Sequence, residues 1–116
     1  MTDIKPNWVT IQHWCTGGLV GFACKGLIRV RLNNETMFIG YGASAGGLGA
    51  RLNAYRNPKG TGKSHYAGQR IHEHRDEIEM QIARLDLPPF AIRLLAKRLI
   101  EKRQPPWNVP PEHQRR

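Results

Sequence analysis

The sequence predicts a single small α/β domain, and two patterns support that prediction. Residues 27–39 contain two apolar–polar alternating runs on either side of a pair of asparagines, as expected for a β-hairpin. Residues 92–99 repeat apolar side chains at helical spacing near the C-terminus. The chain has 116 residues, of which 40% are hydrophobic, and this is enough to form one core.

Residues 1–25 are expected to form an N-terminal segment outside the domain. Residues 8–11 alternate weakly and favour a short strand. The chain begins without the pattern of a signal peptide, and no apolar run approaches the ~20 residues of a membrane span. Cys15 and Cys24 are expected to be free thiols. We therefore expect a cytoplasmic protein that does not associate with membranes.

The hairpin is the clearest local prediction. Residues 27–32 place isoleucine, valine and leucine in alternation with two arginines, which indicates a half-buried strand. Asn33 and Asn34 follow, and asparagine tolerates the positive φ angles of a tight hairpin. Residues 36–39 are predicted to form the returning strand.

Two short helices are predicted after the hairpin. A glycine-rich loop over residues 42–47 leads to the first helix, over residues 48–55. We expect that helix to end there because Asn57 precedes a proline, and such a residue disfavours the α conformation. A polar loop separates it from the second helix, which is predicted over residues 67–75.

Residues 76–85 are compatible with two structures. Ile78, Met80 and Ile82 alternate with polar residues, which indicates a strand. The glutamates, methionine, glutamine and alanine of the same interval favour a helix, on which Ile78, Ile82 and Leu85 would share one face. The residues alone leave this choice open.

The last predicted helix begins at Pro88 and Pro89, since the fixed φ of proline suits a first helical turn. The apolar residues expected to form its buried stripe are Ile92, Leu95, Ala96 and Leu99. The basic residues expected on its outer face are Arg93, Lys97, Arg98, Lys102 and Arg103. Residues 109–116 are expected to form a basic, proline-rich tail.

Short motifs in the chain resemble the signature of the GIY-YIG nuclease superfamily. Gly26-Leu27-Ile28 stands where the family has Gly-Ile-Tyr, and Phe38-Ile39-Gly40 stands where it has Tyr-Ile-Gly, at the family's usual distance. Arg51 and Tyr55 follow at the spacing of the family's arginine and second aromatic position. Asn108 resembles its closing asparagine.

This resemblance covers residues 26–108 and implies a fold and a reaction. The implied fold is α+β, a three-stranded, mainly antiparallel sheet flanked by about three helices, with residues 76–85 as the third strand. The implied reaction is metal-assisted hydrolysis of a phosphodiester. In the family, one tyrosine helps to activate water, the other helps to position the site, the arginine neutralises phosphate charge, a glutamate binds a divalent cation, and the asparagine braces the site.

The chain departs from the family where that chemistry is carried. Ile28 and Phe38 occupy the tyrosine positions, and Ala96 occupies the glutamate position. None of these side chains supplies an acid, a base or an oxygen ligand. The family positions that keep a matching residue are Arg51, Tyr55 and Asn108. We therefore expect no catalytic residue, no metal site and no cofactor, with Mg²⁺ only in the case of a rearranged active nuclease.

The net charge of the chain indicates the chemical class of its binding partner. Eighteen Lys and Arg against nine Asp and Glu give +9, as in proteins that bind phosphates. We expect a non-catalytic nucleic-acid-binding protein on a degenerate GIY-YIG scaffold, which contacts the backbone phosphates of DNA. The candidate contacts are Arg51, Tyr55, Lys59, Lys63, Arg93, Lys97 and Arg98.

Two alternatives remain open from the sequence. The first is a metal-dependent GIY-YIG endonuclease whose catalytic residues are rearranged. The second is a small basic inhibitor or regulator that binds an acidic protein partner.

Overall fold

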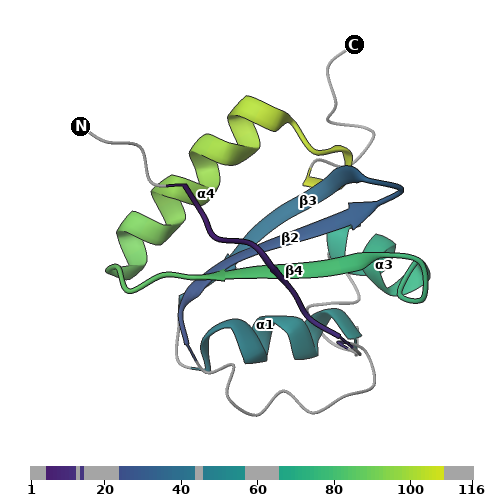
Figure 1. Ribbon diagram of the computed structural model, residues 1–116, viewed down its shortest axis with the longest axis horizontal. Coiled ribbons are helices and arrows are strands. Elements are labelled where there is room, and N and C mark those ends of the chain that lie inside the picture. Colours follow the sequence, from purple (N-terminus) through teal and green to yellow (C-terminus); the bar gives the residue numbers. More distant parts are fainter. Residues whose placement is uncertain (1–4, 13, 15–23, 44–45, 57–65, 109–116) are drawn as a thin grey trace.

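An antiparallel sheet forms the middle layer of the protein (Figure 1). The computed structural model describes residues 5–12, 14, 24–43, 46–56 and 66–108. The elements in chain order are β1 (Val9–Thr10), β2 (Gly26–Leu32), β3 (Glu35–Gly42), α1 (Gly47–Arg56), α3 (Tyr66–Glu73), β4 (Glu79–Arg84), α4 (Pro89–Arg103) and the 3₁₀ helix η1 (Pro106–Asn108). The fold is α+β, as predicted.

The sheet has four strands in the order β1-β4-β2-β3, and each neighbouring pair is antiparallel. The prediction of a three-stranded sheet was therefore wrong, because the sheet contains one more strand. The additional strand is β1, in which Val9 pairs with Ile82, and the Ile11 amide continues the contact by donating to the Met80 carbonyl at 2.8 Å. Residues 8–11 were predicted to form a short strand, but their pairing with a segment about 70 residues away has no local signal.

The predicted hairpin is confirmed. Asn33 and Asn34 adopt positive φ angles of 53° and 66° between β2 and β3. The expectation that β2 is half-buried needs correction at its start, because Leu27 and Ile28 are both 0% exposed. They point to opposite faces of the sheet, and helices cover both faces.

Residues 76–85 form a strand rather than a helix, over the shorter interval Glu79–Arg84. This strand, β4, lies between β1 and β2. Such a central position demands burial on both faces, and the polar Gln81 is buried as well. Gln81 accepts a hydrogen bond from Arg29 Nε at 2.6 Å and donates one to Thr10 Oγ1 at 3.3 Å, so its amide is satisfied by both neighbouring strands.

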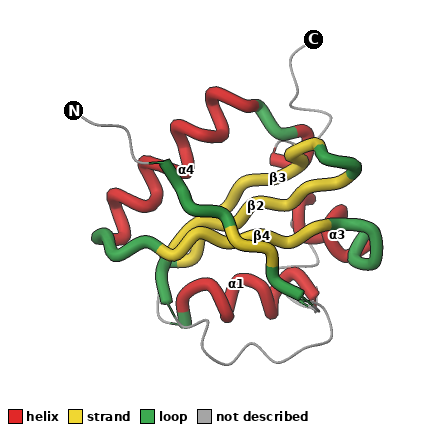
Figure 2. Tube along the Cα trace, viewed as in Figure 1, coloured by secondary structure: helices red, strands yellow, loops and turns green. Residues whose placement is uncertain are grey.

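The helices form layers on the two faces of the sheet (Figures 1 and 2). Helices α1 and α3 pack on one face around Ile28 and Phe38, and α4 packs on the other face around Leu27. Helix α4 begins at Pro89 and ends at Arg103. Gln104 caps it, with φ 49° and its amide donating to the Ile100 carbonyl at 2.7 Å. Across the described part of the chain, every helix is too short or too polar to cross a membrane.

Candidate nucleic-acid interface

The two signature triplets lie side by side in β2 and β3, where Ile28 pairs with Gly40 and Val30 pairs with Phe38. Both triplet glycines allow close approach. A Cβ atom at Gly26 would lie 2.1 Å from a backbone oxygen of β4. A Cβ atom at Gly40 would lie 2.7 Å from the Phe38 ring. The glycines of the motif are therefore needed for packing, whatever the chemistry of the site.

Ile28, Phe38 and Tyr55 meet in the hydrophobic core beneath α1. The Phe38 and Tyr55 rings form an edge-to-face pair with centroids 5.7 Å apart. Burial raises the pKa of the Tyr55 hydroxyl well above its usual value, and the nearby positive charge of Arg51 offsets only part of this rise. The phenol therefore stays neutral at physiological pH.

Arg51 lies one helical turn before Tyr55 on α1, and its side chain is exposed. Its Nε donates to the backbone carbonyl of Tyr41 at 3.2 Å, which anchors the guanidinium beside the end of β3. A guanidinium carries five donors. An arginine held in this way retains donors that can reach a phosphate from solvent.

Asn108 braces the outer strand of the sheet. Its Oδ1 accepts a hydrogen bond from the Ile39 amide at 2.9 Å, and its Nδ2 donates to the Ile39 carbonyl at 2.8 Å. Because β3 is an edge strand, both backbone groups of Ile39 lie on its unpaired side. The side chain thus substitutes for a neighbouring strand at this point.

Ala96 lies on the opposite side of the sheet from Ile28 and Phe38. It is 1% exposed and packs with Leu27, Ala83 and Ile92, so the predicted buried position on the last helix is confirmed. Tyr41 of β3 contacts residues of both groups of family positions. The Tyr41 carbonyl holds Arg51, while the Tyr41 side chain packs against the Ala96 cluster.

The residues at these family positions do not fit a divalent cation. Ile28 and Phe38 are buried hydrocarbon side chains, and Ala96 presents a methyl group to an apolar cluster. Mg²⁺ takes oxygen ligands, mostly carboxylates and waters. Within the described residues, no group of three or more His, Cys, Asp or Glu side chains is placed to hold a metal ion.

The remaining candidate contacts are not all brought together. Arg93, Lys97 and Arg98 are exposed on α4, whereas Arg51 is on α1, across the sheet. Tyr55 is only 5% exposed and lies in the core against Phe38, so its ring is not on the surface beside Arg51. The other two candidates, Lys59 and Lys63, lie outside the described residues.

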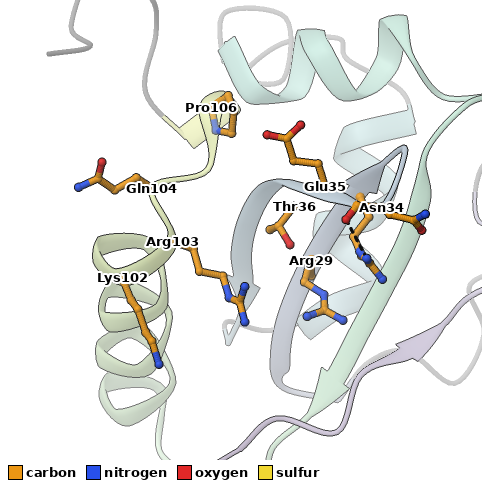
Figure 3. A pocket seen from close by; sticks show the side chains of 9 residues that line it. Arg29, Asn34, Glu35, Thr36, Lys102, Arg103, Gln104 and Pro106 are labelled. Carbon is orange, nitrogen blue, oxygen red and sulfur yellow. Dashed lines mark hydrogen bonds between the residues drawn. The ribbon is translucent and has the colours of Figure 1, made fainter. Parts of the chain in front are cut away.

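The structure also reveals a basic groove that the sequence did not indicate. It lies between the hairpin end of β2–β3 and the last turn of α4, and its volume is about 710 Å³ (Figure 3). The cations that line it are Arg29, Arg31, Lys102 and Arg103. In the sequence, the two strand arginines were expected on a solvated face, and nothing linked them to the end of a helix about 70 residues later.

No protein-family model matches the chain, and no curated protein matches it. Solved structures do match. The GIY-YIG N-terminal endonuclease domain of UvrC from Thermotoga maritima, bound to its catalytic magnesium, is 26% identical with a TM-score of 0.57, and the match covers 78% of this chain and 90% of that one. A tyrosine-to-phenylalanine and an asparagine-to-alanine point mutant of that domain match at 26% and 25% identity, each with a TM-score of 0.58 and covering 79% of this chain and 90% of theirs.

The chain therefore has the fold of the GIY-YIG superfamily, as the signature motifs predicted. The solved structures that show this fold are those of the UvrC endonuclease domain, to which this chain is similar over most of its length.

Proposed function

We propose that the protein binds nucleic acid, with DNA as the expected form, through backbone phosphates and without cleaving it. The observation that carries this proposal is the position of Arg51. This residue keeps the family's arginine position and is exposed, and the Tyr41 carbonyl holds it beside β3. The UvrC domain that shares this fold is an endonuclease domain. A fold that accommodates a phosphodiester, with its arginine retained, supports a phosphate contact here.

The chain's charge supports the same proposal. A net charge of +9 favours a polyanionic partner. Contacts to phosphates position a protein on nucleic acid without reading its sequence. Arg51 is then the central contact. Arg93, Lys97 and Arg98 on α4, across the sheet, stay candidates, as do Lys59 and Lys63 from the sequence.

The absence of cleavage is proposed from side-chain chemistry. Metal-assisted hydrolysis needs a group that activates water and a cation that stabilises developing charge. Ile28, Phe38 and Ala96 supply neither, and each lies in an apolar cluster. Tyr55 is held as a neutral phenol by burial, so it is not available as a phenolate base.

We expect the purified protein to leave supercoiled plasmid intact in Mg²⁺ or Mn²⁺. The measurement is agarose-gel analysis over a long incubation, with the Arg51→Ala variant purified in parallel. Nicking by both preparations indicates a contaminating nuclease. Metal-dependent nicking that disappears in Arg51→Ala would contradict the proposal and establish the rearranged endonuclease instead.

We expect duplex binding of modest affinity and steep salt dependence. If about four to six phosphates are contacted, the plot of log K against log salt has a slope of roughly −4 to −5. Arg51→Ala should weaken binding equally for unrelated sequences and flatten the slope by about one unit. Fluorescence anisotropy on two unrelated duplexes measures both effects.

Arg75→Ala is the matched control for that series, because it removes one exposed positive charge outside the proposed contacts. An equal change in both variants would show that Arg51 acts only through net charge. No detectable binding at low salt would overturn the nucleic-acid proposal and favour an acidic protein partner.

We also propose a cytoplasmic location, where a nucleic-acid partner is accessible and thiols stay reduced. Cys24 is a free thiol among the described residues, and Cys15 lies outside them, so the prediction for the pair stays a prediction.

A further inference from the structure

The basic groove, defined by Arg29, Arg31, Lys102 and Arg103, gathers cations from two distant parts of the chain. Arg29 and Arg31 alternate on β2, and Lys102 and Arg103 end α4. Figure 3 shows Arg103 extending from α4 toward the sheet that carries Arg29. Of the described residues that line the same groove, Glu35 alone carries a carboxylate.

Arg29 is held in place by neutral partners. Its Nε donates to Gln81 Oε1 at 2.6 Å, and its guanidinium lies 4.5 Å from the centre of the Trp8 ring. These contacts fix the orientation of the guanidinium without neutralising it. Burial lowers the pKa of Arg29 below its usual value, and the positive charges of Arg31 and Arg103 lower it further. The groove therefore holds like charges close together, and an anion bound there would relieve their repulsion.

Two carboxylates, Glu35 and Glu79, lie at or beside the groove, against four cations, so they balance part of this charge. Arg31 lies 3.9 Å from Glu79, a distance at the limit of an ion pair, and its Nη2 donates to the Asn34 carbonyl at 2.9 Å. Within the part of the chain that the structure describes, Lys102 and Arg103 form no ion pair. The groove thus has an excess of exposed positive charge.

We propose that the basic groove is a second binding site for the phosphodiester backbone of nucleic acid. This inference rests on the proposed function but concerns different residues. Guanidinium groups match phosphate oxygens with paired donors. Among the described residues, no aromatic side chain lines the groove, so these residues offer bases no stacking platform and recognition falls on the backbone.

The groove and Arg51 are separate sites. The groove lies at the start of β3, beside Thr36, and Arg51 is anchored at Tyr41 near the end of that strand. At ~3.4 Å per residue, the strand between these points spans about 17 Å. Substitutions at such a distance act independently in most cases, so losses at the two sites should add.

The test compares the double variant Lys102→Gln/Arg103→Gln with the control Lys5→Gln/Arg75→Gln. Both remove two exposed positive charges, but the control positions lie outside the groove. The probes are a short fluorescein-labelled duplex and its single strand, measured by anisotropy across a salt series. We expect the groove variant to flatten the slope by about two units on the duplex, and the control to leave it unchanged. In ¹H–¹⁵N spectra of the wild-type protein, the Thr36 and Gln104 amides should shift on titration with the unlabelled duplex.

The outcomes separate this inference from the proposed function. Equal effects of the groove and control variants, or a response to Arg51→Ala but not to the groove variant, would refute the groove as a site and leave the proposed function standing. A response to the groove variant but not to Arg51→Ala would support the groove and remove Arg51 from the interface. If a polyglutamate peptide displaces the probe as readily as unlabelled duplex does, the groove takes carboxylates and the phosphate assignment is wrong.

Discussion

Ala96→Glu is expected to destabilise the protein by about 3 kcal/mol or more and not to restore cleavage. Ala96 is 1% exposed and packs with Leu27, Ala83 and Ile92, so the introduced carboxyl has no polar partner in its cluster. Burying a polar group without a hydrogen bond costs several kcal/mol, and burying its charge costs more. Urea unfolding followed by circular dichroism measures the change.

The loss should depend on pH in a defined direction. Burial raises the pKa of a carboxyl in the folded state above its unfolded value. Stability of the variant relative to wild type should therefore rise as pH falls toward the unfolded value near 4.3. A penalty that is constant or grows on acidification would contradict the buried placement.

Leu94→Glu is the matched control for this substitution. It introduces the same residue on the same helix, but Leu94 is 50% exposed, so we expect a change within about 0.5 kcal/mol. Cleavage should stay absent in Ala96→Glu because Ile28 and Phe38 still supply no group that activates water. Robust Mg²⁺-dependent cleavage by Ala96→Glu alone would show that the missing chemistry had been assigned to the wrong residues.

Trp107→Ala is expected to cost about 3–5 kcal/mol of unfolding free energy. Trp107 is 3% exposed and belongs to the core that contains Ile28 and Phe38. Its ring stacks on His74 with centroids 5.2 Å apart, and the Arg70 guanidinium lies 5.6 Å from its centre. The indole therefore joins the C-terminal segment to α3 and holds the neighbouring Asn108 against β3.

The control for this substitution is Phe90→Ala, which removes another aromatic ring. Phe90 is 61% exposed on the first turn of α4, so its loss should change stability by no more than about 0.5 kcal/mol. Similar losses in the two variants would show that the residues after α4 contribute little to the core, contrary to the packing described here.

Local signals made the central part of this fold predictable. Asn33 and Asn34 predicted the hairpin because asparagine tolerates positive φ angles. The apolar–polar alternation on either side of them predicted the two strands. The buried stripe of the last helix was predictable because helical spacing is a local property. Strand β1 was missed as a sheet member because its partner lies about 70 residues away, and a two-residue strand carries almost no pattern.

The site was less predictable than the fold for the same physical reason. The resemblance assigned Ile28, Phe38 and Ala96 to one family site. No local sequence pattern indicated that the sheet separates Ala96 from the other two residues. The basic groove arises only when the end of α4 packs over the hairpin. The fold itself is shared with an endonuclease domain, but function depends on the residues placed on it.

The central claim, binding to nucleic acid without cleavage, is tested most directly by one anisotropy record. A fluorescein-labelled duplex is mixed with the protein in low-salt buffer that contains Mg²⁺, followed over hours, and then brought to high salt. We expect the anisotropy to rise on mixing, to stay constant, and to return to the value of the intact free duplex when salt is added. Binding without cleavage is contradicted if the anisotropy does not rise, or if it rises and then decays below that value with the wild-type protein but not with Arg51→Ala.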